Sequence, residues 1–64
     1  MSEIEELRAK FVRAYSNLPA PERQQVVALV EDKPYSWDVA YQEIMGKTSL
    51  STKILKKMKL VGIL

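Results

Sequence analysis

The C-terminal stretch from Ser36 to Leu64, SWDVAYQEIMGKTSLSTKILKKMKLVGIL, decides the fold expected of this 64-residue chain. Its first part has the apolar spacing of an amphipathic helix. The residues at i, i+3, i+4, i+7 and i+8 are Trp37, Ala40, Tyr41, Ile44 and Met45. Ser36 is a suitable N-cap for this helix, and Gly46 stands where a helix commonly ends in a left-handed conformation. The sequence therefore predicts a helix from about Ser36 to Gly46.

A second helix is expected directly after a short turn at Lys47 and Thr48, with Thr48 or Ser49 as its N-cap. Gly62 is expected to end it, and residues 61–64 have the character of a short strand or a packed tail. One side of this helix is apolar, and the opposite side carries lysines and hydroxyl groups. The apolar side consists of Leu50, Ile54, Met58 and Val61, with Leu55 at its margin. Two short helices joined by a tight turn predict a helix-turn-helix.

Another helix is expected at the N-terminus, with Ser2 as its cap and Pro19 forcing its end by about Asn17. Its apolar residues recur at spacings of three and four. This stripe admits two interpretations, a face packed on the core or a dimer interface. The residues concerned are Ile4, Leu7, Phe11, Ala14 and Leu18.

The segment of residues 22–32, ERQQVVALVED, is ambiguous. Its first residues favour helix, and Pro21 suits a first helical position. The run VVALV also fits a buried strand, and Glu31 and Asp32 would sit badly at a helix C-terminus. We expect a helix here, followed by a turn at residues 32–34 and a short extended piece at residues 35–37.

These elements predict one domain, residues 1–64, of the all-α class. It comprises an N-terminal helix at residues 1–18, with a possible role in dimerisation, and a helix-turn-helix core at residues 20–64. The expected architecture is a small four-helix domain, and a variant of it includes a short two-stranded extended segment.

Residues 22–64 resemble the winged-helix branch of the helix-turn-helix DNA-binding proteins, which contains small prokaryotic repressors. The resemblance rests on the opening RQQVVALV, residues 23–30, and on the ending LKKMKLVGIL, residues 55–64. Two features depart from the family. The chain ends where the family continues into its β-hairpin wing, and the spacing between the last two helices is about one residue longer.

The resemblance implies that the last helix enters the major groove of double-stranded DNA. The residues implied near base edges are Thr48, Ser49, Thr52, Lys53 and Lys56. Those implied at phosphates are Lys47, Lys57 and Lys59. This face has no Arg, Asn or Gln, the residues best suited to reading guanine and adenine, so binding is expected to be salt-dependent and weakly selective.

Charge is distributed unevenly along the chain. Residues 1–46 contain five basic and eight acidic residues, whereas residues 47–64 contain five lysines and no acid. This asymmetry indicates a polyanionic partner, either nucleic acid or an acidic protein surface. The alternative is a solvated lysine face without a partner.

Other classes of function are disfavoured. The chain has no Cys and no His, which excludes disulfides and zinc-finger sites and removes the commonest catalytic base and nucleophiles. We expect no enzyme activity, no metal and no cofactor. Gly46-Lys47-Thr48 resembles the end of a P-loop, but Tyr41 stands where that motif needs glycine. The aromatic residues can stack on bases, although their helical spacing favours the core.

No segment is apolar enough for a signal peptide or a membrane span, so a cytoplasmic location is expected. Two hypotheses for function follow. The first is a small DNA-binding regulator or accessory factor that acts through the lysine-rich helix, as a homodimer where the N-terminal stripe is a dimer interface. The alternative is a protein-interaction or adaptor module on the same scaffold, without DNA binding.

Overall fold

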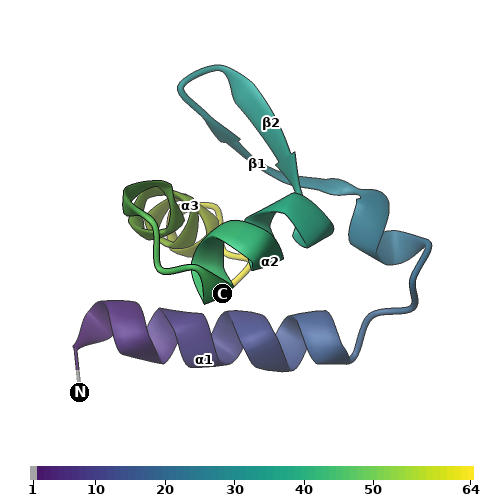
Figure 1. Ribbon diagram of the computed structural model, residues 1–64, viewed down its shortest axis with the longest axis horizontal. Coiled ribbons are helices and arrows are strands. Elements are labelled where there is room, and N and C mark those ends of the chain that lie inside the picture. The colour runs from purple at the N-terminus through teal and green to yellow at the C-terminus, as the bar shows by residue number, and fades with distance from the viewer. Residues whose placement is uncertain (1) are drawn as a thin grey trace.

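Residues 2–64, which the structure describes, form three α-helices and one two-stranded antiparallel sheet in this computed structural model. Figure 1 shows α1 on one side of α2 and α3, with the β-hairpin projecting on the opposite side. The expected all-α four-helix domain is therefore wrong, and the fold is mixed α/β. In chain order the elements are α1 (Glu3–Ser16), the 3₁₀ turn η1 (Glu22–Gln24), β1 (Val26–Val30), β2 (Lys33–Ser36), α2 (Trp37–Met45) and α3 (Ser49–Leu60).

The error lies in residues 22–32, where we expected a helix. Only Glu22–Gln24 are helical, as a single 3₁₀ turn, and Val26–Val30 form β1. Three β-branched valines in five residues favour the extended backbone. A helix would also have placed Glu31 and Asp32 at its negative end, whereas the hairpin uses them as its turn.

The hairpin turns on Glu31 and Asp32, which have φ values of 53° and 66°. Val30 pairs with Lys33 on either side of them, so this is a two-residue turn of type I′. The turn expected at residues 32–34 is thus displaced by one residue, and Lys33 and Pro34 belong to β2. A bulge at Val27 shifts the register before Ala28 pairs with Tyr35.

The predicted helix starts are confirmed by their capping hydrogen bonds. The Ser2 hydroxyl accepts from the Glu5 amide at 3.3 Å, and the Ser36 hydroxyl accepts from the Val39 amide at 3.2 Å. Thr48 rather than Ser49 caps α3, accepting from the Ser51 amide at 3.2 Å.

Helices α2 and α3 both end in a Schellman motif, in which two backbone hydrogen bonds close the last turn and the residue after the C-cap is left-handed. After α3 that residue is Gly62, at φ 86°, and the Ile63 amide donates to the Met58 carbonyl at 2.9 Å. After α2 the left-handed residue is Lys47, at φ 54°, and not Gly46, which is right-handed at φ −79°. The prediction that Gly46 is left-handed is therefore wrong, because the left-handed residue is the next one, Lys47.

The core lies where α3 meets α1, α2 and β1. Leu7 and Phe11 of the N-terminal stripe are buried in it, and Ile4 packs against it. The core-facing interpretation of this stripe thus applies to these residues within a single chain. Ala14 and Leu18 are half-buried, and Leu64 covers the core as a packed tail rather than a strand. The largest fully buried aliphatic side chains are Ile44, Ile54, Leu55 and Met58.

Lys47→Gly is expected to stabilise the protein. A lysine in the left-handed region has a steric cost that glycine lacks, and the net gain is about 0.5–1 kcal/mol after the entropy of glycine is counted. For a domain of this size that corresponds to a rise of about 4 °C in Tm, measured by circular dichroism. Lys47→Ala is the matched control, since it removes the same charge but keeps Cβ. An equal gain in both variants would show that charge, not backbone conformation, is responsible.

Candidate functional site

The exposed side of α3 is a narrow ridge, because three elements cover the rest of the helix. Ser51, Ile54, Leu55 and Met58 are buried against them. The residues of α3 that remain exposed or half-buried along the ridge are Lys53, Lys56, Lys57, Lys59 and Leu60. The packing therefore collects the lysines of α3 on one surface.

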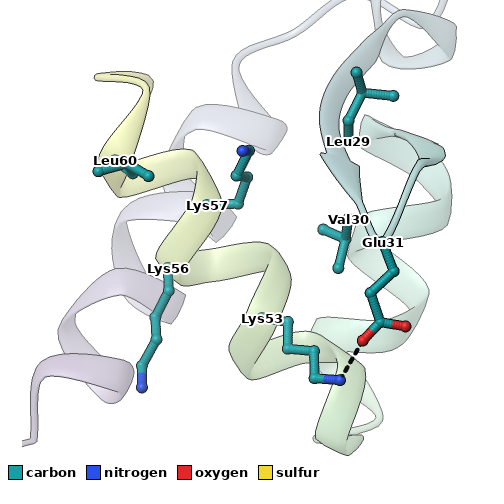
Figure 2. A pocket seen from close by; sticks show the side chains of 7 residues that line it. All are labelled: Leu29, Val30, Glu31, Lys53, Lys56, Lys57 and Leu60. Atoms are coloured by element: carbon teal, nitrogen blue, oxygen red, sulfur yellow. Dashed lines mark hydrogen bonds and ion pairs between the residues drawn. The ribbon is translucent and has the colours of Figure 1, made fainter.

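A groove with a volume of about 390 Å³ lies between this ridge and β1 (Figure 2). Leu29, Val30 and Glu31 line it from the hairpin. Lys53, Lys56, Lys57 and Leu60 line it from α3. We call this surface the basic groove. Its apolar part is exposed, with Leu29 58% and Leu60 78% accessible to solvent.

A second hollow, of about 310 Å³, lies on the other side of the ridge, where α3 faces the start of α1. It is lined by Glu3, Lys56, Lys59 and Leu60. Lys56 and Leu60 contribute to both hollows, so they form the crest between them.

Two of the lysines are paired with carboxylates. The Lys53 ammonium lies 2.6 Å from Glu31 at the hairpin tip, and the Lys59 ammonium lies 3.1 Å from Glu3. The hydrogen bond from Lys53 holds the pKa of Glu31 below its ordinary value, and the same bond raises the pKa of Lys53. All four side chains are more than half exposed, so these pairs add little to stability. They do reduce the positive charge at both edges of the ridge.

The predicted nucleic-acid-binding residues separate into two groups. Lys53, Lys56 and Lys57 line the basic groove, and Lys59 lies across the ridge. The others are at the start of α3: Lys47, Thr48 and Ser49 are exposed, and Thr52 is half-buried. The Thr48 hydroxyl is already engaged, accepting from the Ser51 amide and donating to the Glu43 carbonyl at 3.4 Å.

Leu29, Glu31 and Leu60 were not among the site residues predicted from the sequence. Leu29 and Glu31 reach the groove only because residues 26–30 form a strand whose turn lies beside α3. Side chains alternate between the two faces of a strand. Had residues 26–30 been interpreted as a strand with Ala28 and Val30 facing the core, Leu29 would have been expected on the solvent-facing side. Leu60 was predictable as a large apolar residue on the lysine side of the helix.

The aromatic residues form a packed cluster and not a stacking surface. Phe11 is fully buried, with its ring centroid 5.3 Å from that of Trp37. The rings of Tyr15 and Tyr41 stack at 4.2 Å, and the Arg23 guanidinium lies 4.3 Å from the Tyr15 ring centroid. The Tyr15 hydroxyl donates to the Asp38 carboxylate at 2.7 Å, and this bond raises the pKa of Tyr15. The cluster joins α1 to α2.

Two negative findings concern residues 2–64 only. This part of the chain has no group of three or more acidic, His or Cys side chains arranged to hold a metal ion. Over the same residues, every helix is too short or too polar to cross a bilayer.

Comparison with family models, with curated proteins and with solved structures finds no match for this chain. The resemblance of residues 22–64 to winged-helix domains thus stays a hypothesis drawn from the residues. Any assignment of function rests on the geometry of the basic groove and its surroundings.

The Glu31–Lys53 pair gives a prediction for pH dependence. Because the pKa of Glu31 is lower in the folded chain, its contribution to stability is present above the unfolded-state pKa and is lost as pH falls through the folded-state pKa. An NMR titration of the Glu31 carboxyl should show that pKa rising toward its ordinary value in Lys53→Gln. Lys56→Gln is the control and should leave it unchanged. An unaltered Glu31 titration in Lys53→Gln would mean that the pair does not form in solution.

Proposed function

We propose that this chain is a protein-interaction module that binds an acidic segment of a partner protein in the basic groove. The observation that carries the proposal is the combination of exposed apolar and cationic side chains on one surface. Leu29 and Leu60 are each more than half exposed, and they lie beside Lys53, Lys56 and Lys57. Exposed apolar groups rimmed by polar ones are typical of protein-binding sites.

The surroundings of the groove favour a peptide over a nucleic acid. Glu31 stands at one edge of the ridge and Glu3 at the other, and both carboxylates would repel any anionic ligand, so charge does not separate the two candidates. The apolar side chains do separate them, because the phosphate backbone of a duplex offers no apolar surface to Leu29 and Leu60 and the major groove offers only thymine methyl groups. A segment with both carboxylates and aliphatic side chains can satisfy the lysines and the leucines together.

Double-stranded DNA is the second candidate, supported by a different surface. Lys47, Thr48 and Ser49 are exposed at the start of α3. In helix-turn-helix proteins, the N-terminal residues of the reading helix are the ones that contact base edges. Lys47 lies outside both hollows and has no carboxylate partner among the described residues. This surface does not depend on the groove, so the two candidates can be separated by mutation.

The protein-binding proposal is tested with two labelled acidic peptides, one of alternating glutamate and valine and one amphipathic helix of glutamate and leucine. At least one should bind, measured by fluorescence anisotropy. Lys56→Gln combined with Lys57→Gln should weaken that binding about tenfold, because two exposed charges are lost. Lys10→Gln combined with Lys33→Gln is the control, with the same charge change outside the groove lining. Failure of both peptides to bind would refute the proposal.

Glu31→Gln should strengthen binding of the same peptide, by about threefold, because Lys53 would no longer be shared with an internal carboxylate. Asp32→Asn makes the same charge change at the adjacent turn residue, and the structure gives Asp32 no ion pair with any described residue. Anisotropy titrations of the two variants should therefore differ. Equal strengthening would indicate a general effect of net charge rather than release of Lys53.

The DNA candidate is tested by titrating the protein with duplex DNA at about 50 mM and about 200 mM salt. Binding through phosphates should weaken at the higher salt, since the logarithm of affinity declines linearly with that of salt. Lys47→Gln should weaken DNA binding and leave peptide binding unchanged. Absence of DNA binding even at the lower salt would eliminate this candidate.

A further inference from the structure

The outer edge of β1 faces the basic groove. In both figures β1 lies between β2 and α3, so the edge of β1 that β2 leaves free is the one beside the helix (Figures 1 and 2). The contacts agree, since β1 and not β2 is the strand with extensive contact to α3. The groove therefore has a strand edge as one wall and the lysine ridge of α3 as the other.

Leu29 presents free backbone groups at this edge. In a hairpin with a two-residue turn, the pair next to the turn exchanges hydrogen bonds, and here that pair is Val30 and Lys33. The next pair, Leu29 and Pro34, therefore directs its backbone groups away from the partner strand. Proline is tolerated at position 34 because a backbone N–H there would not take part in pairing with β1. Leu29 makes no backbone hydrogen bond outside the hairpin within residues 2–64.

We propose that the acidic partner segment binds as an extended strand, paired with the free edge of β1 and lying over α3. This inference rests on the proposed function and specifies the conformation of its ligand. The Leu29 N–H and C=O would pair with the backbone of the segment, as in other cases of strand addition to an exposed sheet edge. The result is a three-stranded sheet.

The spacing of the lysines suits an extended segment. Ala28 and Val30 point from β1 toward the core that α3 closes, so alternate residues of an added strand would point toward the same helix. Such residues recur every ~6.6 Å along a strand. Lys53 and Lys57 are separated by one turn of α3, a rise of ~6 Å. Two acidic residues at i and i+2 can thus face these two lysines.

The opposite side of the added strand suits aliphatic residues. Leu29 is 58% exposed and is directed away from the buried face that carries Ala28 and Val30. A branched side chain opposite it would form a cross-strand apolar pair. The preferred segment therefore alternates acidic residues, facing α3, with β-branched residues, beside Leu29.

The decisive experiment uses the unmodified protein and three peptides of alternating glutamate and valine. The first is unmodified, and the other two carry N-methyl groups on either the odd-numbered or the even-numbered residues. The two N-methylated peptides have the same side chains and charges, but a paired strand uses only one set of its N–H groups toward its neighbour. One N-methylated peptide should bind like the parent and the other about tenfold or more weakly. Equal losses, or no loss in either, would overturn strand pairing.

Amide hydrogen exchange gives an independent measurement on the protein. The Leu29 amide should exchange readily in the free protein and be protected about tenfold or more by the unmodified peptide, because strand pairing occupies its N–H. Binding of the helical glutamate and leucine peptide alone, with Leu29 exchange unchanged, would overturn strand pairing and leave the proposed function standing. Failure of both peptide types would overturn the proposed function itself.

Discussion

The burial of α3 against three partners is the constraint on which the rest of the structure depends. Ile54, Leu55 and Met58 are fully buried, and they lie where α1, α2 and β1 converge. A chain this short buries a modest share of its surface, and the described part has neither a disulfide nor a metal site to compensate. Its stability therefore requires that one helix serve as the centre of the core. The lysines of that helix are confined as a result to the strip that packing leaves uncovered.

Periodicity was sufficient to predict α1, α2 and α3. Apolar spacing and capping residues predict the N-terminal stripe, the cap at Ser36 and the end at Gly62. Such local signals suffice for a helix because most of its backbone hydrogen bonds lie within the helix itself. The strand was different, since VVALV fits either structure in isolation. The pairing with Lys33–Ser36 decided the outcome, and pairing is a tertiary property. The acids at the end of this run were the local signal against a helix.

The site was predictable in its charges and unpredictable in its shape. Unbroken lysine content after residue 46 identified the cationic surface from sequence alone. The hairpin that turns this surface into a groove came from the segment that we expected to be helical, so Leu29 and Glu31 were not considered. Sequence also could not show that Glu31 and Glu3, far apart in the chain, approach the same helix from opposite sides. That arrangement reduces the positive charge that the helix offers to any anionic partner.

Glu31 is poorly explained by folding alone. Its left-handed conformation costs about 1–2 kcal/mol relative to the glycine or asparagine that such turns prefer, and glutamate has no short side chain to compensate. Its exposed pair with Lys53 offsets little of this cost. Backbone strain is often found beside binding surfaces, and Glu31 lies in the lining of the basic groove. In the proposed complex, Glu31 occupies Lys53 until an acidic segment replaces it, so segments with few carboxylates would be bound less well. The strained turn would then contribute to selectivity rather than to stability.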